Sequence, residues 1–364
     1  MAANFMTPTS PAPRPLPDLA AEELAAWMEE HGHKAGHAVR VLRQLYAANG
    51  EAERASARIP AGLRELVAAT FPQEAASLAL RQVAADGTSK LLLRLADGRT
   101  VESVLMPDYH PARAAGCISS QVGCAMGCDF CATAQTGFER NLTAGEIVEQ
   151  FIQLRREARA SGRVLRTIVF MGMGEPMLNL RNVLAAVKRI ADPTLGALGW
   201  RQITISTVGI VPGIDELTEA DLGVHLAVSL HAPDDATRAD LLPVGRRFDV
   251  QEVLAAADRY QARSGRITTI QYCLLAGVND SLAQARDLSR LLGGRHMHVN
   301  LLRYNPTGLS LRGRTYAASS VEQAGAFLAE LRARGTVAHL RRARGPDIDA
   351  ACGQLRRREA DRRR

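Results

Sequence analysis

Three cysteines place the strongest constraint on what this chain can fold into. Cys124, Cys128 and Cys131 are spaced as CxxxCxxC. Three thiolates at this spacing bind an iron-sulfur cluster and leave one iron without a protein ligand. That iron can chelate the amino and carboxylate groups of S-adenosylmethionine, and electron transfer then splits the sulfonium into methionine and a 5′-deoxyadenosyl radical. The spacing therefore predicts a [4Fe-4S] cluster, S-adenosylmethionine as cofactor and radical chemistry.

The other metal sites that cysteines form fit this chain less well. Structural zinc takes four ligands from paired motifs, and a ferredoxin-type cluster needs a fourth thiolate nearby. The remaining cysteines are Cys117, Cys273 and Cys352, and they form no second CxxC pair. Cys273 ends an apolar run and is expected in the core. The cluster with an open iron is the favoured interpretation.

Composition indicates a large globular protein rather than a membrane or disulfide-rich protein. A chain of 364 residues with 46% hydrophobic content can bury one large α/β domain plus a small appendage. Its first twenty residues contain no long apolar run, so neither a signal peptide nor a membrane span is expected. We expect a cytoplasmic location, where six cysteines favour metal binding or catalysis over structural disulfides.

Positive charge is concentrated at the carboxyl-terminal end. The net charge is +7, and residues 341–364 hold nine arginines against four acidic residues. Clustered arginine is typical of a phosphate-binding surface and suggests RNA as a partner. A solvated basic end without a partner is the alternative.

The first part of the chain predicts a leader and a small accessory domain. Residues 1–16 are rich in Pro and Ala and are expected to be a disordered leader. Helical periodicity over residues 19–71 predicts three short helices. Three β-like runs follow, with Asp-Gly pairs at residues 86–87 and 97–98 that predict tight hairpins. We therefore expect a helical and β-meander domain over residues 17–106.

Strand and helix patterns alternate from residue 107 onward, which predicts a parallel sheet curled into an incomplete (β/α)6 barrel over residues 107–345. The six expected strands are residues 117–122, 167–170, 202–206, 225–230, 268–272 and 298–302. The clearest expected helices are residues 144–156, 180–190, 250–263 and 281–292. A carboxyl-terminal cysteine loop and basic tail then occupy residues 346–364.

Polar residues follow the expected strands, where a barrel places its active site. Residues 171–176 read Met-Gly-Met-Gly-Glu-Pro. Because this loop neighbours the cysteine loop, Gly174 and Glu175 are expected to hold the methionyl end of the cofactor. The other candidates for its ribose, carboxylate and adenine groups are Ser206, Ser229, Leu230, His231 and Asn305.

Cys352 lies in a glycine-flanked segment with little helical or strand periodicity. Such a segment suits a moving thiol, whereas a lone cysteine is more often buried and inert. Cys117 begins the first expected barrel strand and could meet Cys352 only in three dimensions. Glu102, taken alone, would be a solvent-facing residue on an edge strand.

Four motifs together resemble the RlmN/Cfr family of radical S-adenosylmethionine RNA methyltransferases, over nearly the whole chain. They are Ser-Ser-Gln-Val-Gly-Cys-Ala-Met-Gly-Cys-Asp-Phe-Cys, Met-Gly-Met-Gly-Glu-Pro, Ser-Leu-His-Ala-Pro and Asp-Ile-Asp-Ala-Ala-Cys-Gly-Gln-Leu. The resemblance implies that Cys352 receives a methyl group from one cofactor molecule. A second cofactor molecule yields a radical that activates this methyl group for addition to adenine, which gives a covalent protein-RNA adduct.

The resemblance also assigns the residues that release the product. It implies that Glu102 removes the ring proton and that Cys117 displaces the bound sulfur, forming a transient Cys117–Cys352 disulfide. An electron donor such as flavodoxin or ferredoxin is expected as a partner, and the enzyme is expected to be a monomer.

The two branches of the family differ in the carbon atom that they methylate. The RlmN branch methylates carbon 2 of an adenine in the peptidyl transferase region of 23S rRNA and also a transfer RNA adenine, whereas the Cfr branch methylates carbon 8. Residues 132–138 and 175–179 resemble RlmN, but residues 206–212 and 300–307 resemble Cfr. The leading hypothesis is carbon-2 methylation. Alternatives are carbon-8 methylation, a radical enzyme for a small molecule, and a non-catalytic RNA-binding module with a structural metal.

Overall fold

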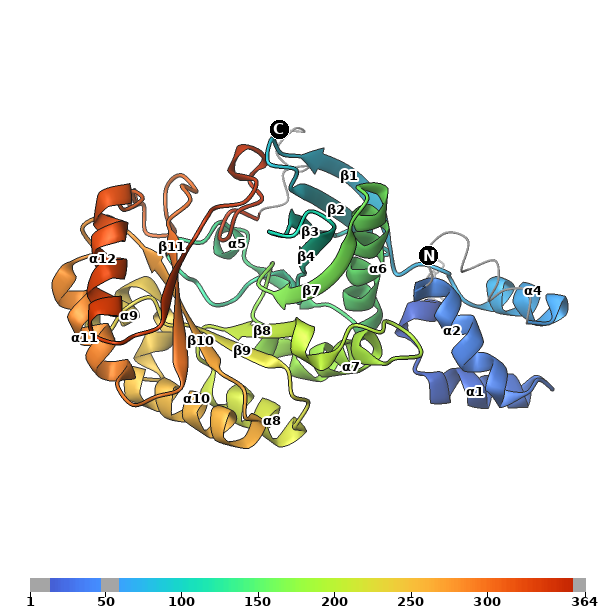
Figure 1. Cartoon of the computed structure of the whole chain (residues 1–364). Coiled ribbons are helices and arrows are strands. Elements are labelled where there is room, and N and C mark those ends of the chain that lie inside the picture. Colours follow the sequence, from blue (N-terminus) through green and yellow to red (C-terminus); the bar gives the residue numbers. More distant parts are fainter. Residues whose placement is uncertain (1–13, 47–58, 356–364) are drawn as a thin grey trace, which may run out of the picture. The chain divides into compact units, whose positions relative to one another are not determined.

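The computed structural model describes residues 14–46 and 59–355 (Figure 1). It divides the chain into two compact units, Met1–Ala75 and Ala76–Arg364. The predicted basic tail and most of the predicted leader lie outside the described residues. Within those residues, no helix combines the length and the apolar character that crossing a bilayer requires.

The first unit is helical, as the periodicity predicts. Its described helices are η1 (Leu16–Asp18), α1 (Ala21–Glu30), η2 (Ala35–His37), α2 (Ala38–Tyr46) and α4 (Ala61–Thr70). Val41, Leu42 and Tyr46 lie at helical spacing on α2, and all three are buried. Leu16 is also buried, and its N–H bonds to the Pro72 carbonyl at 2.8 Å. The expectation of a disordered leader reaching residue 16 is therefore wrong at its last residues.

The β-meander forms as predicted. Its strands are β1 (Ala76–Val83), β2 (Ser89–Leu95) and β3 (Thr100–Pro107). Gly87 and Gly98 turn the two hairpins with φ values of +80° and +83°, which favour glycine. The expected domain boundary near Met106 differs from the structure, because β3 pairs antiparallel with the next strand, so that Val104 lies opposite Cys117. The meander is thus continuous with the barrel sheet.

The barrel is one curved ten-stranded sheet in the order β1-β2-β3-β4-β7-β8-β9-β10-β11-β12. Parallel pairing runs from β4 to β12. It confirms five of the six predicted parallel strands, shifts the first from residues 117–122 to Arg113–Cys117, and adds a seventh strand, β12. These strands are β4 (Arg113–Cys117), β7 (Val164–Phe170), β8 (Ile203–Thr207), β9 (His225–Ser229), β10 (Thr268–Leu274), β11 (Met297–Arg303) and β12 (Ala338–Arg341).

The first barrel strand ends earlier than expected. β4 ends at Cys117, and the chain then leaves the sheet, so that β5 (Gln121–Gly123) pairs with β6 (Phe138–Asn141) in a separate two-stranded sheet. The side chain of Gln150 holds this exit, because its Oε1 accepts from the Ser119 N–H at 2.7 Å and its Nε2 donates to the Ser119 carbonyl at 3.0 Å. Cys117 therefore ends the strand on the side where active-site loops gather, rather than beginning it.

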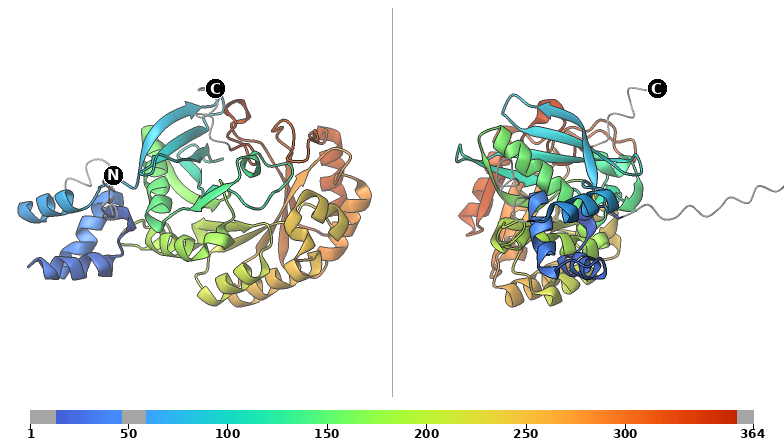
Figure 2. Two further views of the ribbon diagram at one scale, coloured as in Figure 1. Left: turned by 180° about the vertical axis from the view of Figure 1, so that it is seen from behind. Right: turned by 90° about the vertical axis from the view of Figure 1, so that its right-hand side faces the viewer.

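Helices cover the outer side of the barrel strands (Figures 1 and 2). The α-helices are α5 (Ala132–Gln135), α6 (Ala144–Ala160), α7 (Leu180–Ala191), α8 (Val211–Ala220), α9 (Asp235–Leu241), α10 (Val250–Ser264), α11 (Leu282–Leu292) and α12 (Val321–Ala333). Short 3₁₀ turns are η3 (Pro176–Asn179), η4 (Trp200–Gln202), η5 (Pro243–Arg246) and η6 (Pro346–Ile348). A capping box of Thr143 and Glu146 begins α6.

An ion pair joins α6 to the meander. Both oxygens of Glu157 accept from Arg81, at 2.7 to 2.9 Å, and Oε1 also accepts from the Ser89 hydroxyl at 2.8 Å. Burial raises the pKa of Glu157, but the hydrogen bonds from Arg81 and Ser89 outweigh it, so that its pKa lies below the ordinary value. The folded state therefore favours the carboxylate form.

This pair predicts a pH-dependent loss of stability in Glu157→Gln. A carboxylate with a lowered pKa stabilises the fold above its unfolded pKa, about 4.3, and this contribution is lost as pH falls through the folded pKa. We expect Glu157→Gln to lower the free energy of unfolding by about 1–3 kcal/mol near pH 7, with the difference from wild type shrinking below pH 4. Urea unfolding at several pH values measures this, and Glu216→Gln, at an exposed position, is the control. A difference that does not vary with pH would contradict the assignment.

Candidate active site

A cavity of about 160 Å³ opens where the loops after the parallel strands converge. It brings together most of the predicted site residues, namely Cys124, Cys128, Cys131, Gly174, Glu175, Ser206, Ser229, His231, Asn305 and Cys352. The described lining does not include Leu230, Cys117 or Glu102. The parallel pairing of the strands explains the convergence, because it puts their carboxyl ends at one edge of the sheet.

The three clustered cysteines lie on the loop between β5 and α5. The Cys124 N–H donates to the Gly137 carbonyl at 2.9 Å, and the Cys131 N–H donates to the Cys128 carbonyl at 3.1 Å. Cys131 also occupies the N-cap position of α5. Backbone hydrogen bonds thus fix the cysteine loop at both ends.

Asp129, between the cysteines, anchors this loop to the loop after β11. Its Oδ2 accepts from the Tyr316 hydroxyl at 2.6 Å and lies 3.4 Å from Nε of Arg314, while Oδ1 accepts from the Arg312 N–H at 3.0 Å. Asp129 is fully buried, so these partners compensate the desolvation of its carboxylate. Its side chain consequently faces the protein rather than the cavity.

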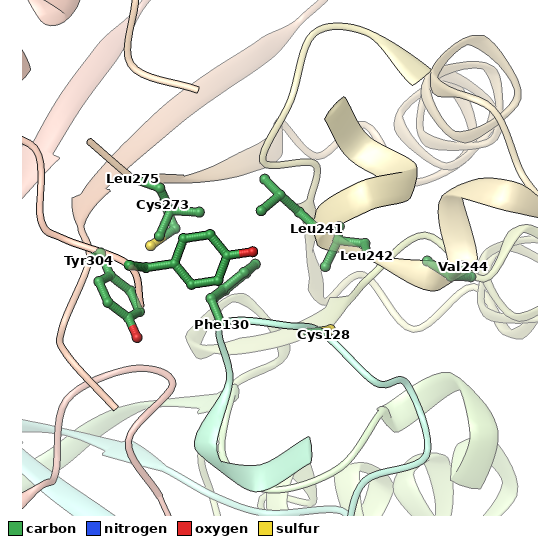
Figure 3. Close-up of a cluster of buried hydrophobic side chains, with 9 residues drawn as sticks. Cys128, Phe130, Leu241, Leu242, Val244, Cys273, Leu275 and Tyr304 are labelled. Carbon is green, nitrogen blue, oxygen red and sulfur yellow. The ribbon is translucent and has the colours of Figure 1, made fainter. Parts of the chain in front are cut away.

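Apolar side chains pack against the cysteine loop. Cys128 and Phe130 belong to a buried cluster with Leu241, Cys273 and Tyr304 (Figure 3). The ring of Phe130 also meets the imidazole of His231 edge to face, with centroids 5.2 Å apart. The expectation that Cys273 belongs to the core is confirmed, although Cys273 lines the cavity as well.

The donor set fits an iron-sulfur cluster better than a single metal ion. Three cysteine sulfurs face one cavity, which is the ligand chemistry that such clusters require. In the part of the chain that the structure describes, no three His, Cys, Asp or Glu side chains are arranged to hold one metal ion. Cluster ligands bind different iron atoms and need not converge on one point, so this arrangement argues against the structural-zinc alternative.

Burial strongly affects the cysteine thiols. It raises the pKa of Cys124 to about 12, opposed by a backbone hydrogen bond at Met126, and it raises the pKa of Cys128 well above its ordinary value. Thiols in this environment stay protonated at neutral pH. Iron binding would therefore have to displace their protons.

Glu175 joins two loops at the cavity wall. Its Oε1 accepts from the Met177 N–H at 3.1 Å, and its Oε2 accepts from the Val208 N–H at 2.9 Å. Burial raises the pKa of Glu175 to about 7, although these hydrogen bonds act in the opposite direction. The carboxylate thus fixes the loop after β7 against the loop after β8 and leaves lone pairs for a cationic group in the cavity.

Gly174 allows a close approach that no other residue could make. Its φ is +97°, and a Cβ built there would lie 2.6 Å from the Cβ of Gln121. Gln121 in turn accepts the Glu175 N–H through its Oε1 at 2.9 Å. Glycine at this position therefore lets the glutamate loop pack against the segment that precedes the cysteine loop.

His231 is held as a neutral imidazole with a defined tautomer. Burial, together with the smaller effect of the Arg238 guanidinium, lowers its pKa to about 3. Its Nδ1 lies 3.0 Å from the Cys273 backbone nitrogen, whose N–H can only donate. The ring proton must therefore be on Nε2, on the opposite side of the ring, where it can serve as a hydrogen-bond donor.

The remaining strand-end residues differ in what they contact. Ser206 and Ser229 line the cavity from β8 and β9. Leu230 is fully buried, and its N–H donates to the Gln271 carbonyl at 3.1 Å, so its contact with the cofactor stays a prediction. Asn305 lines the cavity, but its Nδ2 also donates to the Cys352 carbonyl at 3.3 Å.

The segment carrying Cys352 is hydrogen-bonded directly after the cysteine, whereas the sequence suggested a flexible loop. The Gly353 carbonyl accepts from the Ala132 N–H at 2.8 Å, and the Leu355 carbonyl accepts from the Thr133 hydroxyl at 2.8 Å. These bonds tie the segment to α5, directly after the cluster cysteines. Cys352 is exposed to solvent while its thiol faces the cavity.

Cys117 is buried behind the cavity wall at the end of β4. Burial raises its pKa, and so does the neighbouring Cys352 thiol, so the two sulfurs lie within electrostatic range of each other. Both thiols are free. The fold thus brings together two cysteines that are 235 positions apart, 352 − 117, in the sequence.

Glu102 occupies the interior of the sheet. Its exposed fraction is 2%, and its Oε1 lies 3.2 Å from Nζ of Lys90. β3 has β2 on one side and β4 on the other, so the expectation of a solvent-facing residue on an edge strand is wrong. Sequence reasoning missed Lys90, and it also missed Asp129, although the position of Asp129 inside the cysteine motif was a usable signal.

The close contact between Gly174 and Gln121 predicts that Gly174→Ala damages the site more than the same substitution at other glycines with positive φ. Alanine at positive φ costs about 1 kcal/mol, and displacement of Gln121 adds at least about 1–3 kcal/mol of overpacking strain. We expect lower stability in urea unfolding and weaker equilibrium binding of S-adenosylmethionine. Gly162→Ala is the control, because its φ is +70° and no heavy atom lies within 4 Å of the added Cβ. Equal effects of the two substitutions would contradict the prediction.

Comparisons with known proteins place this chain in a family. The model of the Radical SAM superfamily matches residues 118–288. A relative from Opitutus terrae, named "Probable dual-specificity RNA methyltransferase RlmN 1", is 68% identical over 341 residues, which are 94% of this chain and 96% of the relative. A relative from Thermus thermophilus with the name "Probable dual-specificity RNA methyltransferase RlmN" is 42% identical over 95% of this chain and 94% of its own length.

A solved structure agrees with these sequence relatives. The crystal structure of a radical SAM methyltransferase from Sphaerobacter thermophilus superimposes with a TM-score of 0.88 at 42% identity, covering 94% of this chain and 99% of that chain. The family resemblance and the fold class expected from the sequence are thereby confirmed. The chain belongs to the RlmN family of RNA methyltransferases in the radical SAM superfamily.

Proposed function

We propose that this enzyme methylates carbon 2 of adenine in 23S rRNA and in transfer RNA through an S-methylcysteine on Cys352. One observation carries the proposal: the thiol of Cys352 faces the same cavity as the three clustered cysteines, with Cys117 in electrostatic range. Relatives named as dual-specificity RNA methyltransferases support two RNA substrates. Family membership disfavours both a non-catalytic module and a small-molecule enzyme.

The cavity residues divide into a cluster site and a cofactor site. Cys124, Cys128 and Cys131 would hold a [4Fe-4S] cluster, and Gly174 and Glu175 would hold the methionyl end of S-adenosylmethionine. When bound, the cluster and S-adenosylmethionine together supply a 5′-deoxyadenosyl radical.

The rest of the cofactor would meet polar groups from three further loops. Ser206 and Ser229 offer hydroxyl groups, and His231 offers its Nε2 proton to an oxygen or nitrogen acceptor. Asn305 would position both the cofactor and Cys352, since it already donates to the Cys352 carbonyl.

A cysteine carrier is needed because carbon 2 of adenine has no lone pair that could attack a sulfonium methyl group. Cys352 is the residue placed to act as the carrier, since it is exposed and a thiolate is a strong nucleophile. Its sulfur loses the thiol proton and takes a methyl group, which then loses one hydrogen atom to the 5′-deoxyadenosyl radical. The carbon then bonds to the adenine ring while still attached to sulfur, and the unpaired electron left on the ring would pass to a one-electron acceptor, which the bound cluster would supply. The enzyme and the RNA are covalently joined at this stage.

Release of the product would use the two buried groups behind the cavity. Glu102 accepts the proton that leaves the methylated ring carbon, and the electron pair of the broken C–H bond stays with the ring. Cys117 loses its proton and bonds to the Cys352 sulfur as the bond between this sulfur and the methyl carbon breaks. The electron pair of that bond stays with the carbon, which takes up a proton to complete the methyl group. The two thiols have then lost two electrons, so an external thiol or reductase must reduce the disulfide before the next turnover.

Mass spectrometry of digested RNA tests the proposed function. After anaerobic reaction with 23S rRNA or transfer RNA, we expect 2-methyladenosine in both. The Cfr-like residues 206–207 and 302–305 line the cavity, which gives carbon-8 methylation a specific basis as the second candidate. Finding 8-methyladenosine instead would select it, and finding neither nucleoside would reject the proposal.

Cys117→Ala tests the release step. Without the second thiol the sulfur of Cys352 cannot be displaced, so we expect an RNA-protein adduct that survives denaturing electrophoresis. Cys273→Ala is a matched control, because Cys273 is also a buried thiol near Cys352 but has no role in the proposal. Multiple turnovers by Cys117→Ala would remove Cys117 from the mechanism.

A further inference from the structure

A buried ammonium group lies next to the proposed base. Lys90 is 3% exposed, and its Nζ lies 3.2 Å from Oε1 of Glu102. The same nitrogen donates to the Asp349 carbonyl at 3.4 Å. One side chain thus touches both the carboxylate of Glu102 and the segment that carries Cys352.

Burying this pair is costly, so its position needs an explanation. β2 is otherwise rich in leucine, and Leu91, Leu92 and Leu93 are all buried beside Lys90. Removing an ammonium and a carboxylate from water costs several kcal/mol each, and a well-packed apolar pair is often at least as stable. The fold alone therefore does not require a lysine here.

The second contact connects Lys90 to the chemistry. Asp349 precedes Cys352 by three positions and adopts a left-handed φ of +51°, which is unusual for a residue other than glycine. Two further hydrogen bonds hold the same segment to the β1–β2 turn: Gly345 N–H to Asp86 at 3.3 Å, and Ala85 N–H to Asp347 at 3.0 Å. Figure 2 shows this segment beside the β1–β2 hairpin.

The contact of Lys90 with the Asp349 carbonyl connects the segment to a different element than the Asp86 and Asp347 bonds do. The bonds of Asp86 and Asp347 connect the segment to a surface turn, whereas Lys90 connects it to the strand pair that holds Glu102. At 3.4 Å the bond to the Asp349 carbonyl is at the long end for a hydrogen bond, so the segment can shift without breaking a strong interaction. The ion pair to Glu102 stays within β2 and β3.

We propose that Lys90 is a positioning residue for product release. Its side chain holds Glu102 as a carboxylate and fixes the position of Glu102 relative to the segment that carries Cys352. This inference rests on the proposed function, in which Glu102 takes the ring proton. In that step Glu102 changes from carboxylate to carboxylic acid beside Lys90. Its bond to the Asp349 carbonyl then keeps the ammonium partnered after the carboxylate charge is gone.

Lys90→Met tests the inference by separating two stages of one reaction. We expect methylation of Cys352, read by mass spectrometry of the intact protein, to continue near the wild-type rate. Decay of the RNA-protein adduct, read by denaturing electrophoresis, is expected to slow by ~10-fold to ~100-fold, less than the ~100-fold to ~10,000-fold expected for loss of the general base itself. Lys90→Arg, which keeps the charge, is expected to restore part of the decay rate.

Two further variants show whether slower adduct decay in Lys90→Met comes from a folding defect. Lys90→Gln keeps a donor for the Asp349 carbonyl without a charge, and it is expected to fold and to slow adduct decay as well. The double variant Lys90→Met/Glu102→Gln is expected to be no slower than Glu102→Gln alone, because both residues act in one step. Lys188→Met, on the exposed side of α7, controls for loss of a lysine.

The outcomes distinguish the inference from the proposed function. Unchanged adduct decay in folded Lys90→Met and Lys90→Gln would overturn the inference. Parallel loss of Cys352 methylation and adduct decay would also overturn it, since that pattern indicates a merely structural residue. A wild-type enzyme that forms no 2-methyladenosine would instead reject the proposed function.

Discussion

Parallel pairing from β4 to β12 is the constraint on which the rest of the structure depends. Each strand pairs with its neighbour in the same direction, so the loops that follow the strands must meet at one edge. Cysteines, glycines and polar residues from distant parts of the sequence share one cavity for this reason. The chain leaves this sheet after Cys117. Gln150 on α6 holds it there by hydrogen bonds to both backbone groups of Ser119.

Features that depend on local spacing or on strand ends could be predicted from the sequence. The CxxxCxxC spacing indicated the cluster loop, and the glycines before Glu175 indicated a close approach to the cavity. The rule that sites follow parallel strands found Ser206, Ser229, His231 and Asn305. Leu230, predicted by the same rule, is fully buried and is not among the described lining residues, so its contact with the cofactor stays a prediction.

Features that depend on distant partners could not be predicted from the sequence. Asp129 and Tyr316 bond across 187 positions, and Arg312 joins them from the same distant loop. No local pattern marks β3 as an interior strand, so Glu102 is expected at the surface until β4 is placed beside β3. Nor did glycines around Cys352 reveal that the segment is hydrogen-bonded, because its partners lie in α5 and in the β1–β2 turn.

Unequal burial of the two thiols gives the proposed chemistry an order. Cys352 is exposed, whereas Cys117 is buried and its pKa is raised by burial and by Cys352. Only a thiolate attacks a methyl sulfonium or a sulfur atom efficiently. Burial raises the pKa of both thiols, but the Arg341 guanidinium opposes the rise at Cys352, whereas the Cys352 thiol adds to it at Cys117. In the proposed order Cys352 therefore ionises more readily and receives the methyl group, while Cys117 stays protonated. Once the Cys352 sulfur is methylated it cannot ionise, so its contribution to the raised pKa of Cys117 disappears at the stage when a second thiolate is needed.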